Sequence, residues 1–237
     1  MQDDPVTPQR AYYERTAEHY DAMHVSDLDE HGTALALFSG LARLAQARTV
    51  LDVGAGTGRA ITLLGQLLPD VQVTGVEPVE ALRVVGHRRG IDPARLIDGD
   101  ALALPFADDA FDFVIETGVL HHIPTPRRAV EEMVRVARKG VMISDSNKLG
   151  QGRAMTRLVK NAIAAMGLWD ALIWATTKGK MAKYSEGDGV FYSYSVFDDL
   201  EAVKRKFPKV HLFNTVPMPG ANIKTGAGQM AVIALKD

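Results

Sequence analysis

The sequence contains no cysteine among its 237 residues. This absence excludes a disulfide framework, a zinc–thiolate site and a cysteine nucleophile. Long apolar runs are also missing, because none approaches the length of a membrane-spanning helix. Residues 1–13 are polar and acidic, whereas a signal peptide would need an apolar core there. We therefore expect a cytoplasmic protein.

A strong excess of one charge sign is missing as well. The formal net charge is −2, whereas domains that bind nucleic acids usually carry a marked basic excess, so no nucleic-acid partner is expected. The charges are distributed unevenly, since residues 146–190 hold seven bases against three acids. Arg153, Arg157 and Lys160 form a basic stripe within this stretch. The stripe fits an anionic substrate, a membrane surface or a solvated helix face.

The length and composition are those of one α/β domain. A chain of 237 residues with 46% hydrophobic residues can bury one large core and is short for two, so we expect a single domain over 1–237. Short apolar runs alternate with helical patterns, which predicts a doubly wound, mostly parallel, seven-stranded Rossmann-like sheet. The last strand is expected to be antiparallel, because the connection before it is too short for a crossover helix. The expected strands are 49–53, 72–76, 95–97, 111–117, 140–144, 210–216 and 229–235.

Two segments fall outside this alternation. We expect an amino-terminal helical cap over residues 1–45 and a helical substrate-recognition insertion over residues 148–194. Within the insertion, apolar residues recur at helical spacing over 152–177, which predicts one long amphipathic helix or a broken pair. The following polar, glycine-containing stretch 178–189 predicts a loop.

The most informative stretch is the turn after the first expected strand, where the sequence reads Val50-Leu51-Asp52-Val53-Gly54-Ala55-Gly56-Thr57-Gly58-Arg59. Glycines at alternate positions between a strand and a helix leave bare backbone against which a ligand can lie, near the positive end of the helix dipole. An NAD-dependent dehydrogenase would need its third fingerprint glycine where Arg59 stands. The sequence therefore disfavours a dinucleotide site.

This turn and four further motifs in the same order resemble the class I S-adenosylmethionine-dependent methyltransferases of the small-molecule type. The further motifs are Glu77 after the second strand, Asp100-Ala101 after the third, Leu104-Pro105-Phe106 with Asp109-Ala110-Phe111-Asp112, and Leu120-His121-His122-Ile123. The resemblance implies that the glycine turn holds the methionine part of the cofactor, the Glu77 carboxylate accepts the ribose hydroxyls and Asp100 contacts the adenine. The cofactor residues that it implies are Tyr20, Asp52, Gly54, Ala55, Gly56, Gly58, Glu77, Pro78, Asp100, Ala101, Glu116 and Thr117.

Methyl transfer from a sulfonium needs little acid–base chemistry, because the leaving group departs as a neutral thioether. The protein must mainly align the acceptor and exclude water. A hydroxyl acceptor must also lose a proton, and a histidine suits that task. His121 and His122 follow the fourth expected strand, at the sheet edge where α/β proteins bind ligands. Their side chains are expected to diverge, so at most one faces the acceptor; a loop-ordering role is the alternative.

The end of the fifth expected strand carries Asp145-Ser146-Asn147. This stretch resembles the Asp-Asn pair that binds Mg²⁺ in catechol-type O-methyltransferases, but the match is partial because a serine separates the pair. A further carboxylate ligand is missing unless Glu116 or a histidine replaces it, so Mg²⁺ stays an open alternative and no metal ligand is assigned. We count Asp145 with the two histidines as catalytic candidates. The substrate-binding candidates are Asn147, Tyr192 and Tyr194.

The sequence therefore predicts an enzyme that moves a methyl group from S-adenosylmethionine to a small molecule, with a sugar or secondary-metabolite hydroxyl favoured. The Asn-Pro-Pro-Tyr type signature of amino-group methyltransferases is absent after the fourth strand, where Glu116-Thr117-Gly118-Val119 stands. The alternatives are a quinone, lipid or amine acceptor, and a non-catalytic module that binds the cofactor and regulates a partner. A homo-oligomer also stays open.

Overall fold

A seven-stranded sheet forms the centre of the computed structural model, which describes residues 7–24, 29–217 and 222–236. The strand order is β3-β2-β1-β4-β5-β9-β8. The strands are β1 (Thr49–Val53), β2 (Gln72–Val76), β3 (Leu96–Ile97), β4 (Phe111–Thr117), β5 (Ala137–Ser146), β8 (Lys209–Asn214) and β9 (Gln229–Leu235). Strands β1 to β5 pair in parallel, whereas β9 is antiparallel to both β5 and β8. The predicted doubly wound sheet with an antiparallel last strand is confirmed.

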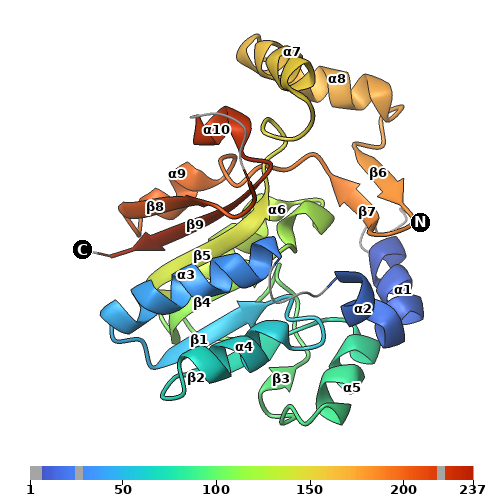
Figure 1. Ribbon diagram of the computed structural model, residues 1–237. Coiled ribbons are helices and arrows are strands. Elements are labelled where there is room, and N and C mark those ends of the chain that lie inside the picture. The colour runs from blue at the N-terminus through green and yellow to red at the C-terminus, as the bar shows by residue number, and fades with distance from the viewer. Residues whose placement is uncertain (1–6, 25–28, 218–221, 237) are drawn as a thin grey trace.

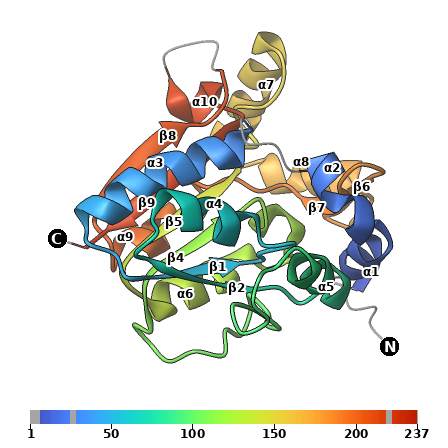
Figure 2. The ribbon, with the colours of Figure 1, turned by 60° about the horizontal axis from the view of Figure 1, so that its bottom comes forward.

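Helices cover both faces of this sheet (Figure 1 and Figure 2). Alternate residues of a strand point to opposite faces, so Phe113 and Ile115 of β4 pack in one hydrophobic cluster and Val114 in the other. The first face is covered by α3 (Glu30–Leu44) and α4 (Arg59–Leu67), and the second by α6 (Pro126–Val136) and α9 (Leu200–Lys204). The remaining helices of this part are α5 (Glu80–Arg88) and α10 (Ile223–Gly226).

The amino-terminal helices lie against the sheet edge at which the parallel strands end (Figure 1). They are α1 (Thr7–Thr16), the 3₁₀ turn η1 (Ala17–His19) and α2 (Tyr20–His24). Tyr13 and Tyr20 join them through an edge-to-face contact with ring centroids 5.6 Å apart. Residues 1–6 and 25–28 of the expected cap lie outside the described residues. The last helix of the segment, α3, packs on the sheet instead of capping its edge.

The insertion after β5 contains two helices, α7 (Ala154–Ala165) and α8 (Trp169–Thr176). They are the broken-pair alternative of the sequence prediction, because they meet at 115° where Gly167 has a φ of +71°. Figure 1 places them outside the layers that cover the sheet. Within the described residues no single helix is long and apolar enough to span a bilayer, and this bent pair reaches that length only jointly.

The stretch 178–189, predicted as a loop, is in part a β-hairpin. Strand β6 (Ala182–Ser185) pairs antiparallel with β7 (Gly189–Tyr192) across the turn 186–188. Gly189 has a φ of +73°, the left-handed conformation that a three-residue hairpin turn with a glycine bulge requires. The hairpin packs against α1 and brings its turn to the sheet edge (Figure 1).

Candidate active site

The loops that follow β1, β2 and β4 line one cavity at the carboxyl ends of these parallel strands. Gly54 and Gly56 have φ values of +71° and +55°, which glycine adopts without strain. A Cβ atom on Gly54 would collide with the Val119 side chain. Bare backbone therefore faces the cavity. Its lining includes Arg10, Tyr13, Tyr20, Gly54, Gly56, Glu77, Pro78, Asp100, Ala101, Leu102, Thr117 and His122.

Glu77 is held at the end of β2 by two backbone donors. The Gly56 N–H donates to Oε2 at 3.0 Å and the Val79 N–H donates to Oε1 at 2.9 Å. Burial raises the pKa of Glu77 to about 6, although these two donors work in the opposite direction. A carboxylate has about four acceptor sites, so two remain. Glu77 can therefore accept hydrogen bonds from the two hydroxyls of a vicinal diol.

Asp52 is buried in β1, and its Oδ1 atom has no hydrogen-bond partner among the described residues. Burial, followed by the charge of Glu77, raises the pKa of Asp52 to about 7. Two mutually repelling carboxylates beside a glycine turn disfavour an anionic ligand. A cationic ligand would relieve the repulsion and stabilise both charges.

The amino-terminal helices complete the wall of this cavity. Tyr20 lies over the glycine turn, with its ring edge 3.3 Å from the place of a Cβ on Gly56. The Arg10 guanidinium donates to Asp100 Oδ2 at 2.7 Å. The Asp100 Oδ1 atom accepts from the Leu102 N–H at 2.8 Å. Asp100 is thereby fixed at the rim of the cavity.

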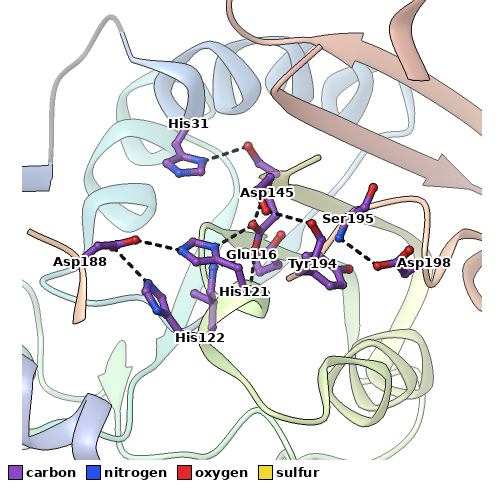
Figure 3. A network of polar contacts seen from close by, with 12 residues as sticks. His31, Glu116, His121, His122, Asp145, Asp188, Tyr194, Ser195 and Asp198 are labelled. Atoms are coloured by element: carbon purple, nitrogen blue, oxygen red, sulfur yellow. Dashed lines mark hydrogen bonds and ion pairs between the residues drawn. The ribbon is translucent and has the colours of Figure 1, made fainter. Parts of the chain in front are cut away.

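Two histidines and two aspartates meet beside this cavity, as Figure 3 shows. His121 and His122 lie in the 3₁₀ turn η2 (Leu120–His122) after β4. His121 Nδ1 is 2.7 Å from Asp145 Oδ1, and His121 Nε2 is 3.6 Å from Asp188 Oδ2. His122 Nε2 is 3.4 Å from Asp188 Oδ1. The prediction that the two rings diverge is wrong, because the hairpin turn brings one carboxylate within reach of both.

The two carboxylates change the protonation of His121. Burial alone would lower the pKa of His121, but Asp145 and then Asp188 outweigh it and raise the pKa to about 10. Burial alone would raise the pKa of Asp145, and the His121 imidazolium instead holds it below its usual range. Burial alone would also raise the pKa of Asp188, but His121 and His122 hold it far below its usual range. At neutral pH the three groups are therefore an imidazolium between two carboxylates.

A second cavity, of about 370 Å³, lies on the far side of His121 and Asp188. Helix α8 supplies Trp169 and Ile173 to its wall, and β7 supplies Phe191 and Tyr192. An intervening hollow shares Gly54 with the lining of the first cavity, and His121 and Asp188 with the lining of the second. We call the second one the acceptor cavity; its further lining residues include Ser146, Lys148, Gln151, Lys160, Leu172, Thr176, Met181, Lys183 and Tyr194.

The sequence of this chain is similar to those of known proteins. Residues 51–144 match the family model of a methyltransferase domain. An uncharacterised methyltransferase of Mycolicibacterium paratuberculosis is 31% identical over 189 residues, which are 73% of this chain and 69% of that protein. The chain belongs to the class I S-adenosylmethionine-dependent methyltransferases.

One further relative and one solved structure with a similar fold have names that state an acceptor. A phosphatidylethanolamine N-methyltransferase of Cereibacter sphaeroides is 33% identical over 125 residues, 51% of this chain and 60% of that protein. Phospholethanolamine N-methyltransferase 2 of Haemonchus contortus, solved with phosphomonomethylethanolamine and S-adenosylhomocysteine, superposes with a TM-score of 0.62 at 16% identity, covering 96% of this chain and 59% of that one. The methyltransferase thus spans about three fifths of the length of each of these two proteins.

The first cavity fits S-adenosylmethionine, which supplies the activated methyl group in this family. The unpartnered oxygen of Asp52 and the Glu77 carboxylate suit a cationic ligand that carries a ribose diol. The bare backbone at Gly54 and Gly56 allows close approach. Of the residues that the sequence assigned to the cofactor, Tyr20, Gly54, Gly56, Glu77, Pro78, Asp100, Ala101 and Thr117 line this cavity, and Ala55 lines the adjoining hollow.

Three of the residues assigned to the cofactor line neither space. Asp52 lies within β1 behind the turn. Gly58, with a φ of +88°, is the N-cap residue immediately before α4. Glu116 is fully buried; its Oε2 accepts from the Val119 N–H at 2.9 Å, and burial raises its pKa well above the usual range. Glu116 therefore orders the loop that carries the histidines.

Two assigned substrate residues lie mainly in the interior. Asn147 is fully buried, and its amide donates to the Lys224 and Ala227 carbonyls at 2.8 and 2.9 Å while its oxygen accepts from Ser195 Oγ. Asn147 therefore has a structural role in place of the predicted substrate contact. Tyr194 is only 2% exposed and packs in the core, so it forms part of the acceptor cavity's inner wall, whereas Tyr192 is more open.

The donor set does not resemble the Mg²⁺ site that the sequence left open as an alternative. One group of described residues could hold a metal ion, namely His121, His122 and Asp188, whose ligand atoms lie within 4.8 Å of one another. Two imidazoles and one carboxylate suit transition metals better than Mg²⁺, which prefers oxygen ligands. Asp145 uses Oδ1 to hold His121. Asp188 and the hairpin were missed by the sequence prediction, although Asp188-Gly189 directly before the apolar run 190–192 is a hairpin signal.

Proposed function

We propose that this methyltransferase moves the methyl group of S-adenosylmethionine to a hydroxyl of a small molecule bound in the acceptor cavity. A hydroxyl of a sugar or of a secondary metabolite is the acceptor that we favour, and the cytoplasm is the location. The observation that carries the proposal is the setting of His121. Asp145 holds its Nδ1 at 2.7 Å, while its Nε2 lies between the cofactor cavity and the acceptor cavity.

In this proposal His121 is the general base. Asp145 fixes the orientation of the ring and stabilises the imidazolium that proton transfer creates. The 3.6 Å between His121 Nε2 and Asp188 exceeds a hydrogen bond, so an acceptor hydroxyl can compete for Nε2. As the oxygen–methyl bond forms, the hydroxyl proton passes to Nε2 and the electron pair of the carbon–sulfur bond stays on sulfur. A displaced Asp188 no longer raises the pKa of His121, which favours the neutral ring beforehand.

The wall of the acceptor cavity supports a polar ring compound. Trp169, Phe191 and Tyr192 offer aromatic surface on which a sugar or a phenolic ring can stack. Lys160 and Lys183 add positive charge to the same wall. A cationic amine would be repelled by these lysines, whereas an acceptor with a carboxylate or phosphate group would be attracted.

A lipid or phosphorylated amine is the second candidate. The names of the Cereibacter sphaeroides and Haemonchus contortus relatives favour it, and the lysines of the cavity suit a phosphate group. An amine also has to be neutral when it attacks, so His121 would have the same task.

The test is a transfer assay with methyl-labelled S-adenosylmethionine. Sugars and phenolic metabolites are compared with phosphoethanolamine and phosphatidylethanolamine as acceptors, and the labelled atom is identified by mass spectrometry. His121→Gln should lower kcat at least about 100-fold with cofactor binding retained. The matched control His211→Gln changes an exposed histidine on β8 and should have no effect. Products methylated only on nitrogen, or an active His121→Gln variant, would refute the proposal.

A further inference from the structure

The insertion after β5 carries most of the large exposed apolar side chains of the described residues. Ten large hydrophobic side chains are exposed, and eight of them lie between positions 155 and 184. Helix α7 has no buried residue at all. We call these eight residues the apolar arm: Met155, Leu158, Val159, Met166, Leu168, Trp174, Met181 and Tyr184.

The apolar side chains of α7 form a single stripe. Met155, Leu158 and Val159 follow one another at the spacing i, i+3, i+4, which places them on one helix face. Met155 is 70% and Leu158 65% exposed, so this face is turned away from the protein. The neighbouring helix uses Trp169 and Ile173 for its inner face, on the acceptor cavity. An apolar patch of this kind on a protein surface marks an interaction site.

Basic residues surround the stripe. Residues 153–184 hold six bases and one acid. Arg157 lies on the face of α7 opposite the stripe, since it is two residues after Met155 at 100° per residue, and Arg153 is the N-cap residue just before the helix. Lys178, Lys180 and Lys183 are exposed in the segment that also carries Met181 and Tyr184. Helices that lie in the membrane interface combine an apolar face, a basic face and nearby tryptophan. Helix α7 supplies the first two features, and the exposed Trp174 lies on the neighbouring α8.

The positive charge near the apolar arm favours a membrane over a second copy of the chain as its binding partner. A symmetric dimer through the apolar arm would bring two basic segments together, because a two-fold interface uses the same patch twice. Anionic lipid headgroups would instead neutralise these bases. The 115° bend between α7 and α8 suits helices that lie on a bilayer. We propose that the apolar arm docks on anionic lipid bilayers, with its aliphatic side chains and Trp174 inserted at the level of the headgroups.

Docking in this way places the acceptor cavity next to the lipid surface, because Trp169 and Ile173 of α8 form part of the wall of that cavity. The inference does not depend on the acceptor. Membrane binding of the arm is a property of the protein alone and can be measured without methyl transfer.

Vesicle flotation tests the proposal directly. The protein is mixed with vesicles of phosphatidylcholine alone or of phosphatidylcholine with phosphatidylglycerol, and the bound fraction is measured at low and high salt. The protein should float with the anionic vesicles, less so at high salt. The variant with Leu158→Glu and Val159→Glu should bind at least about tenfold more weakly. Leu44→Glu is the matched control, because Leu44 is 81% exposed on α3, and it should bind like the unchanged protein.

Two further measurements complete the test. Binding of S-adenosylhomocysteine and the thermal unfolding midpoint confirm that each variant is folded. The Trp174 fluorescence should shift to the blue on anionic vesicles and Trp174→Phe should remove the shift, since Trp169 is already buried. The proposal would be overturned if the variant with Leu158→Glu and Val159→Glu bound anionic vesicles as well as Leu44→Glu does. Failure of the unchanged protein to float would also overturn it. A dimer that Leu158→Glu dissociates would also overturn it in favour of a second copy.

Discussion

His121 and Asp145 lie 24 positions apart in the chain, yet their side chains are joined by a contact of 2.7 Å between Nδ1 and Oδ1. The parallel pairing of β4 with β5 brings this about, because η2 follows the end of one strand and Asp145 lies near the end of the other. The opposite nitrogen of the same ring faces Asp188. The reactivity of the histidine is therefore controlled by two carboxylates from two different parts of the fold.

The first prediction concerns the pH dependence of turnover. The pKa of His121 is raised to about 10, since Asp145 and Asp188 outweigh the effect of burial, and only the neutral ring accepts a proton. We expect kcat/KM to rise with pH, and the rising limb of this profile should have its apparent pKa near that value. The reason is that kcat/KM reports the ionisation of the free enzyme. Asp188→Asn removes one carboxylate and should move this limb down by about one pH unit. Glu186→Gln, an exposed change in the same hairpin turn, should leave it in place, and an unmoved limb in Asp188→Asn would contradict the assignment.

A second prediction concerns Asp52. Its pKa in the folded protein is about 7, raised by burial from the ordinary value of 3.8. The folded state thus keeps a proton that the unfolded chain has released, so this group makes the protein less stable as the pH rises from about 4 to about 7. Asp52→Asn should raise the free energy of unfolding by about 1 kcal/mol or more at pH 8, and by less at pH 5. Calorimetry should at the same time show weaker binding of S-adenosylmethionine; unchanged binding would exclude an electrostatic role.

Glu77 gives a third prediction, in which binding and stability change together. Glu77→Ala removes the acceptor of the Gly56 and Val79 N–H groups. The variant should lose about 1–3 kcal/mol of stability and bind S-adenosylhomocysteine at least about tenfold more weakly. Glu80→Ala, at an exposed position on α5, is the control in urea unfolding and in calorimetry. Undiminished affinity in Glu77→Ala would rule out the ribose contact.

The glycine turn gives a fourth prediction. Gly54→Ala would have its Cβ in collision with Val119 and would keep a positive φ. We expect a loss of about 1–3 kcal/mol in the free energy of unfolding, from both overpacking and backbone strain. Val119→Ala in the same chain should recover only part of it, because the strain remains. Gly40→Ala on α3, where nothing lies within 4 Å, should instead be neutral or stabilising.

The sheet and the glycine turn could be predicted because short, local sequence patterns indicate both. Each central strand is a continuous apolar run, as Val50 and Leu51 of β1 illustrate, since parallel strands are buried on both faces. The glycine turn follows one of these strands directly. The rule that ligands bind at the carboxyl ends of parallel strands then brings Glu77 and Asp100 to the same edge without knowledge of any long-range contact.

The acceptor side could be predicted only in part, because distant contacts determine it. Tyr192 and Tyr194 were both predicted to bind the substrate, but β7 ends at Tyr192 and the second ring packs in the core. Asp188 is placed by Gln9, which donates to its carbonyl oxygen at 3.0 Å from 179 residues away. No local sequence pattern predicts a contact between residues so far apart in the chain.

Gln9 joins α1, which lines the first cavity, to the β6–β7 hairpin, which lines the acceptor cavity. Gln9 also accepts from the Val190 N–H, and Tyr12 of the same helix donates to the Glu186 carbonyl at 3.0 Å. Asp188, one of the two aspartates that raise the pKa of His121, is thus held through its backbone by α1. A protease cut or a truncation that removed α1 would consequently alter the proton affinity of His121. It would also remove Arg10 and Tyr13 from the wall of the first cavity and so should weaken cofactor binding.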